Sequence, residues 1–228
     1  MSVDEILGRL EALADPEAAE GMARYGIRAT RVYGVSIPEL RRMAREIGRS
    51  HDLARQLWMR DSRETRVLAS MIDDPSRVTE GQLDRWARDF DSWEVCDQCC
   101  MNLVEKTPFA YQKCIEWSSE EEEFVKRAGF VLMARLAVSD KKAGDDQFER
   151  YLPVIKREAG DGRNMVKKAV NWALRQIGKR NLALNAKVLE TAREIGQMDS
   201  RGARWIAADA IRELTSQAVQ DRLAARGK

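Results

Sequence analysis

The chain has 228 residues, of which 44% are hydrophobic and 33% charged, and its 39 lysines and arginines nearly balance its 37 aspartates and glutamates. This apolar content suffices for a packed globular core. No run approaches the roughly 18 apolar residues of a membrane-spanning helix, and residues 1–8 lack the basic and apolar regions of a signal peptide. These features argue against a membrane protein and a secreted protein, and we expect a cytoplasmic monomer.

The charge is distributed unevenly along the chain. Residues 1–139 carry 20 Lys and Arg against 25 Asp and Glu, a net charge of −5, whereas residues 140–228 carry 19 against 12, a net charge of +7. Such asymmetry suits a surface that meets a polyanion such as DNA. A merely solvated Lys and Arg face would give the same pattern.

Helix signals dominate the sequence, because apolar residues recur at intervals of three and four and strand-like alternation is nearly absent. Capping-box pairs mark several helix starts. These pairs are Ser36 with Glu39, Thr79 with Gln82, Asp91 with Glu94, and Ser119 with Glu122. The sequence therefore predicts an all-α protein.

Four segments share a pattern in which one or two basic residues introduce an apolar helical run. They are residues 63–69, 124–130, 165–170 and 202–207. Their basic residues Arg66, Arg127, Lys168 and Arg204 are 61, 41 and 36 residues apart. The first gap contains another helix start near its middle, so the underlying period is roughly 30 to 41 residues, which is typical of HEAT-like paired-helix repeats.

This period predicts a single domain, residues 1–228, built as a HEAT-like helical solenoid, an α-α superhelix. Its concave face would be the DNA-binding face if the recurrent basic residues gather there. One helix of each repeat lines the concave side, so the recurrent basic residues would gather in one groove. Two plainer interpretations stay open. The helices could form an irregular bundle, and each basic residue could merely cap or solvate its own helix.

The segment 91–97 (DSWEVCD) combines an aromatic residue with a carboxylate. It opens a helix with Asp91 as a plausible cap, and Trp93 and Asp97 lie four residues apart on one helical face. An aromatic face beside a carboxylate is a candidate functional site. The structural alternative is a core tryptophan and an aspartate that only interacts with the helix dipole.

Three segments resemble the DNA alkylation repair family, the AlkC- and AlkD-like HEAT-repeat glycosylases, and the resemblance covers nearly the whole chain. They are residues 33–41 (YGVSIPELR), 91–97 (DSWEVCD) and 167–176 (KKAVNWALRQ), and the Trp-Ala-Leu-Arg core of the last is the most specific. The resemblance implies a DNA glycosylase that removes cationic N3- or N7-alkylated purines from double-stranded DNA. It implies no metal and no cofactor.

The active site of this family combines two tryptophans, an aspartate and an arginine, which the resemblance places on Trp93, Trp172, Asp97 and Arg127. Asp97 would stabilise the cationic sugar that forms when the base departs, and the tryptophans would offer π faces to the base. Arg127 would hold a neighbouring phosphate. The predicted DNA contacts are Lys126, Lys167, Lys168, Arg175, Lys179 and Arg204.

Four cysteines, Cys96, Cys99, Cys100 and Cys114, suggest a zinc site at first sight. They lie within an apolar helical pattern, however, and the single histidine, His51, is distant in the sequence. Zinc sites usually place paired cysteines in turns. We therefore expect reduced core thiols and no metal.

Three functions remain open on this basis. The first is the glycosylase, and the second is a non-catalytic HEAT-repeat protein that recognises damaged or branched DNA through the same groove. The third is a protein scaffold without DNA affinity, against which the net charge of +7 in residues 140–228 argues. Only the glycosylase would release a free base.

Overall fold

The computed structural model describes residues 1–27 and 31–226, and within these ranges it contains helices and turns but no strand. The prediction of an all-α protein is therefore confirmed. The chain divides into two compact units, Met1–Phe109 and Ala110–Lys228. No helix in the described ranges is long and apolar enough to cross a membrane.

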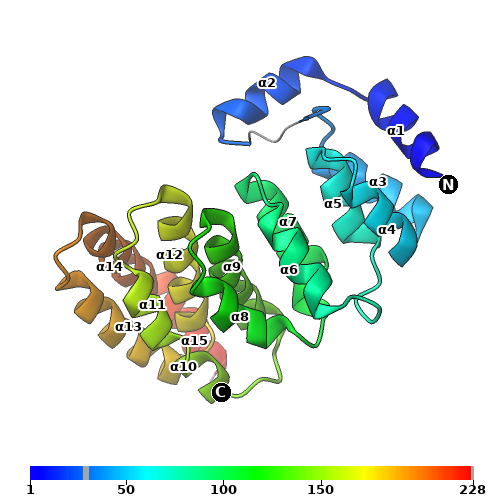
Figure 1. Ribbon diagram of the computed structural model, residues 1–228. Helices are drawn as coiled ribbons and strands as arrows, with labels where there is room; N and C mark the ends of the chain where they lie inside the picture. Colours follow the sequence, from blue (N-terminus) through cyan, green and yellow to red (C-terminus); the bar gives the residue numbers. More distant parts are fainter. Residues whose placement is uncertain (28–30, 227–228) are drawn as a thin grey trace. The chain divides into compact units, whose positions relative to one another are not determined.

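The first unit is built around one central helix, α5, drawn in cyan in Figure 1. Its helices are α1 (Val3–Ala12), α2 (Pro16–Arg24), α3 (Ile37–Ile47), α4 (His51–Trp58), α5 (Arg63–Ile72), α6 (Glu80–Arg88) and α7 (Trp93–Asn102), followed by the short 3-10 helix η1 (Val104–Lys106). Helix α5 packs against α3, α4 and α7 and is buried along nearly its whole length. The rings of Trp58 and Trp86 stack at 3.9 Å between α4 and α6.

The second unit is built around α9 and α12. Its helices are α8 (Ala110–Ser118), α9 (Glu123–Ser139), α10 (Asp146–Glu149), α11 (Leu152–Glu158), α12 (Asn164–Gly178), α13 (Leu182–Gly196), α14 (Arg201–Leu214) and α15 (Gln217–Arg226). Helix α9 packs against α8 and α12, and α12 also packs against α13 and α14, as Figure 1 shows. Because α9 is apolar on most of its surface, it forms the core of this unit.

The helices repeat at the predicted interval. The second helix of each successive pair, which is α5, α7, α9, α12 or α14, begins at residue 63, 93, 123, 164 or 201, so the intervals are 30, 30, 41 and 37 residues. Hydrogen bonds in the second unit likewise join residues that are 38 positions apart. Examples are Arg127 to the carbonyl of Met165 and Asn171 to Asp209, at 2.7 Å each. These hydrogen bonds therefore connect the second helices of neighbouring repeats.

Two of the four predicted helix caps are correct. The side chains of Ser36 and Thr79 each accept a hydrogen bond from the backbone N–H three residues later. The caps predicted at Asp91 and Ser119 are wrong. Helix α7 is capped by Ser92, one residue later, and α9 begins without a side-chain cap. A cap prediction from spacing alone fails here because several polar residues adjoin each start.

Candidate functional site

Helix α7 carries the aromatic residue and the carboxylate that the sequence singled out. Trp93 is its first residue, is half-buried, and donates a hydrogen bond from its indole nitrogen to the carbonyl of Tyr25 at 2.9 Å. Asp97 lies one turn further along, with 8% of its surface exposed. The expected arrangement on one helical face therefore holds in the first unit.

Asp97 occupies a distinctive register in the repeat. It is the fifth residue of α7, as Arg127 is the fifth residue of α9 and Lys168 the fifth residue of α12. A carboxylate thus occupies the position at which two other repeats have a basic residue. An anion in the second turn of α7 gains little from the helix dipole, which acts mainly within the first turn, so the dipole alone does not explain this position.

A buried ion network holds the first turn of α7. Arg63 donates from Nε to Glu94 at 2.6 Å and from Nη1 to Glu64 at 3.0 Å. Glu64 in turn accepts hydrogen bonds from the backbone N–H groups of Tyr33 and Gly34, both at 3.0 Å. Residues 33–41, the first segment of the family resemblance, therefore have a structural role. Through this network they are linked to α7, the helix that carries Trp93.

Arg127 and Trp172 lie in the second unit, on the packed helices α9 and α12. Arg127 is buried, and its Nη1 donates to the carbonyl of Met165 at 2.7 Å, in the first turn of α12. Trp172 is half-buried in the middle of α12. The four residues implied by the family resemblance thus fall two in each unit.

Three of the predicted DNA contacts form close ion pairs with half-buried carboxylates of the same unit. The ammonium nitrogen of Lys126 lies 2.7 Å from Glu158, and that of Lys179 lies 2.6 Å from Glu213. Arg175 also pairs with Glu213. Burial alone would raise the pKa of Glu158 and Glu213, but the adjoining cations outweigh it and hold each pKa below its usual value.

A second group of cations lies exposed at the N-termini of α12 and α14. We call the surface formed by Lys167, Lys168, Arg201, Arg204 and Trp205 the amino-terminal edge. Lys168, Arg201 and Arg204 are exposed, and the ammonium of Lys167 lies 4.9 Å from the centre of the Trp205 ring. Trp205 is itself 42% exposed. Helix N-termini with exposed cations favour phosphate.

Arg201 is a member of this edge that the sequence analysis did not single out. It is the first residue of α14, directly after the capping Ser200, and it has no ion pair among the residues that the structure describes. The capping serine followed by a basic first turn is the signal that could have identified it. Its neighbour Arg204 lies 3.4 Å from Asp199, but both side chains are exposed, so this pair is weak.

Arg66 shares the sequence pattern of Lys168 and Arg204 but not their exposure. It is buried in the first unit, where its guanidinium lies 2.8 Å from Asp91 and 2.6 Å from Asp61. Its guanidinium also lies over the ring of Trp58 at 5.7 Å. Arg66 therefore stabilises the start of α7 through Asp91, whereas Lys168 and Arg204 face solvent.

The cysteines are core thiols, as predicted. All four are buried, and burial raises the pKa of Cys114 to about 12 and that of Cys99 and Cys100 well above the usual value. Within residues 1–27 and 31–226 there is no cluster of three or more His, Cys, Asp or Glu side chains that could hold a metal ion.

The family of the chain follows from comparison with known proteins. A family model described as DNA alkylation repair enzyme matches residues 6–214. The chain belongs to the DNA alkylation repair enzyme family. No curated protein matches it.

The fold of this member of the DNA alkylation repair family was compared with solved structures. It is similar, with a TM-score of 0.81, to a protein from a family described as related to the HEAT-like repeat DNA glycosylases, with affinity for branched DNA structures. The two chains are 20% identical, and the match covers 98% of this chain and 96% of the other. The predicted HEAT-like repeat fold is therefore confirmed.

Proposed function

We propose that this member of the DNA alkylation repair family is a DNA glycosylase that hydrolyses the N-glycosidic bond of N3- or N7-alkylated purines in duplex DNA. The observation that carries the proposal is the placement of Asp97 one turn from Trp93 on the same face of α7. At the same register the next two repeats carry Arg127 and Lys168. The family match over residues 6–214 supports the same activity.

The chemistry explains why a carboxylate and aromatic rings suit this reaction. Alkylation at N3 or N7 gives the purine a positive charge, so the base departs with the electron pair of the broken bond as a neutral molecule. The anomeric carbon of the deoxyribose then has cationic character until a water adds to it and loses a proton. The carboxylate of Asp97 would stabilise this charge, which develops only in the transition state.

The tryptophans would contribute binding to the charged base. A cation over an aromatic face is worth about 0.5 to 2 kcal/mol, and only the alkylated base carries this charge. The hydrogen bond from Trp93 to the carbonyl of Tyr25 fixes the orientation of the indole ring. Trp93 and Trp172 are both half-buried, so each ring keeps some accessible surface.

The amino-terminal edge would hold the DNA backbone. Lys168, Arg201 and Arg204 are exposed near the N-termini of α12 and α14. The helix dipole adds to the attraction for phosphate in the first turn of α14, where Arg201 and Arg204 lie. When these cations bind the DNA backbone, they displace counterions condensed on the DNA. We therefore expect DNA binding to weaken steeply as the salt concentration rises. Affinity that does not change between low and physiological salt would contradict this part of the proposal.

A second candidate function is non-catalytic binding of damaged or branched DNA. Two observations favour it. The solved structure of similar fold comes from a family described as having affinity for branched DNA. In addition, only 8% of the surface of Asp97 is exposed, which also suits a carboxylate with a purely structural role.

The two functions are separated by one assay of the wild-type protein. Duplex DNA with a single N7-methylguanine is incubated with excess protein, and the released base is quantified beside a heated blank and an unmodified duplex. The glycosylase proposal predicts release of free N7-methylguanine above the blank. Binding of the lesion duplex or of a four-way junction without release would favour the second function, and absence of any DNA binding would contradict both.

A further inference from the structure

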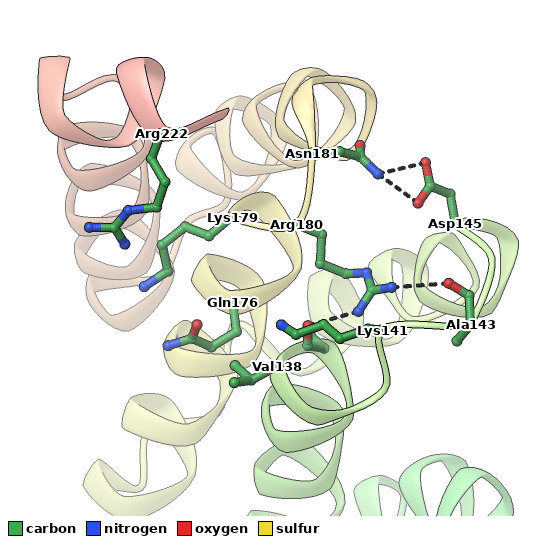
Figure 2. A pocket seen from close by; sticks show the side chains of 10 residues that line it. Val138, Lys141, Ala143, Asp145, Gln176, Lys179, Arg180, Asn181 and Arg222 are labelled. Carbon is green, nitrogen blue, oxygen red and sulfur yellow. Dashed lines mark hydrogen bonds between the residues drawn. The ribbon is translucent and has the colours of Figure 1, made fainter. Parts of the chain in front are cut away.

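A pocket of about 600 Å³ lies in the second unit, where α9 and α12 end (Figure 2). Lys179 marks the end of α12 that adjoins the pocket, whereas Lys168 belongs to the amino-terminal edge. These two residues are eleven positions apart, which corresponds to about 16 Å along a helix axis. The pocket therefore lies apart from the amino-terminal edge, although Lys179, which lines it, is also a predicted DNA contact.

The lining of this pocket is strongly basic. Four of its side chains are cationic, Lys141, Lys179, Arg180 and Arg222, and the acidic one is Asp145. In Figure 2 they project from the segment after α9, from the end of α12 and from α15. Positive charge from three separate segments around one hollow favours an anionic ligand.

The acidic groups nearby do not cancel this charge. Asp145 accepts two hydrogen bonds from the side-chain amide of Asn181, at 2.8 and 3.0 Å. Glu213 pairs with Lys179 at 2.6 Å. Lys141 and Arg222 are exposed, and neither forms an ion pair with any residue in the described part of the chain. Two cations therefore remain available to a ligand.

Arg180 forms a rigid part of the pocket wall. Its Nη1 donates to the carbonyls of Ala137 and Asp140 at 2.8 and 2.9 Å, and its Nη2 donates to the carbonyl of Ala143 at 3.0 Å. The guanidinium also lies 3.9 Å from the centre of the Phe148 ring. Arg180 thus neutralises the negative end of the α9 dipole, which would otherwise repel an anion.

We propose that this pocket binds a compact phosphorylated ligand of nucleotide size, such as a free nucleotide or the 5′-phosphate end of a DNA strand. Its volume lies within the range of small-ligand sites. Lys141 and Arg222 would hold the phosphate. The exposed side chain of Val138 offers an apolar contact for a base or sugar, and the half-buried amide of Gln176 offers a hydrogen bond.

Calorimetric titration of the full chain tests the proposal with two pairs of probes. The first pair is adenosine triphosphate and adenosine, and the second is a short single-stranded oligonucleotide with and without a 5′-phosphate. We expect at least one phosphorylated probe to bind at a single site about tenfold or more tightly than its unphosphorylated partner. Tighter binding of adenosine triphosphate would indicate a free nucleotide as the ligand, and tighter binding of the 5′-phosphorylated oligonucleotide would indicate a strand end. Either result supports the proposal that the pocket binds a phosphorylated ligand.

Three variants locate the binding. Arg222→Gln and Lys141→Gln should each weaken the phosphorylated probe by about tenfold, because each removes a charged donor. Arg193→Gln is the matched control, since Arg193 is an exposed cation on α13 outside the pocket lining. Equal weakening by the control, no effect of either pocket variant, or no binding of either phosphorylated probe at millimolar concentration would overturn the proposal. Loss of glycosylase activity would leave all these outcomes unchanged.

Discussion

The carboxylate of Glu213 on α14 lies 2.6 Å from the ammonium nitrogen of Lys179 on α12, and it also pairs with Arg175. Both cations are predicted DNA contacts, so phosphate has to compete with Glu213 for them. We expect Glu213→Gln to raise the affinity for duplex DNA about two- to fivefold, the value of a partly exposed ion pair. It should also steepen the dependence of affinity on salt, by up to about one unit of logarithmic slope for each cation that gains a phosphate.

The control for this prediction is Glu190→Gln. Glu190 is exposed on α13, and its substitution changes the net charge of the protein by the same amount. Fluorescence anisotropy at several salt concentrations measures both variants. Equal changes in the two variants would mean that only net charge matters and that Arg175 and Lys179 do not contact DNA.

The pairing of these cations also shows where prediction from the sequence ends. The period of the basic segments anticipated the helical repeat, because four of the repeats place a basic residue at the fourth or fifth position of the second helix, as for Arg127 and Lys168. The partners Lys126 and Glu158, however, are 32 residues apart, and Lys179 and Glu213 are 34 apart. Such pairs depend on how neighbouring repeats pack, which the pattern within one helix does not contain.

The candidate site likewise contains features that the sequence could predict and features that it could not. Trp93 and Asp97 could be placed on one face because they belong to one helix and are four residues apart. The burial of Arg127 could not be predicted, since it depends on the carbonyl of Met165, 38 residues later.

Gly34 is a position where any side chain should destabilise the first unit. Its φ is +82°, and a Cβ added there would lie 2.1 Å from the carbonyl oxygen of Asp15. We expect Gly34→Ala to lower the free energy of unfolding by at least about 2 kcal/mol, because backbone strain and a clash add. Urea denaturation measures this loss.

Gly48 provides the matched control. Its φ is +74°, but a Cβ added there would have no neighbour within 4 Å, so Gly48→Ala carries the backbone strain without the clash. Its expected cost is about 1 to 2 kcal/mol. If Gly34→Ala costs no more than Gly48→Ala, the close approach of Gly34 to Asp15 does not contribute to stability.

Cys114 should make the protein less stable in alkali. Burial raises the pKa of its thiol from 9.0 to about 12. Between these values the folded protein holds a proton that the unfolded chain releases, so stability is complete below about pH 9 and falls as the pH rises toward 12. One such thiol contributes a slope of up to about 1.4 kcal/mol per pH unit.

The variant Cys114→Ala should have a shallower alkaline slope by this amount. Denaturation by urea at several pH values from 8 to 10.5 gives the slope directly. Val131→Ala is the control, because it also removes a few buried atoms in the second unit without removing a titrating group. An unchanged slope in Cys114→Ala would show that this thiol titrates normally in the folded protein.

Asp97→Asn tests the catalytic role of the carboxylate, because it keeps the size of the side chain and removes its charge. If Asp97 stabilises the sugar cation, the chemical step should slow by about 10²- to 10³-fold, which corresponds to about 3 to 4 kcal/mol. Binding of the lesion duplex should persist or tighten, since one negative charge is lost. Asp91→Asn is the matched control, because Asp91 pairs with Arg66 at the start of the same helix.

The most direct measurement is the single-turnover rate of N7-methylguanine release by the wild type, Asp97→Asn and Asp91→Asn, recorded beside thermal melting and duplex affinity. The account predicts release by the wild type and by Asp91→Asn, and a loss of at least about 10²-fold in Asp97→Asn with its melting temperature and DNA affinity retained. Near-normal release by a folded Asp97→Asn would contradict the account and remove Asp97 from the active site.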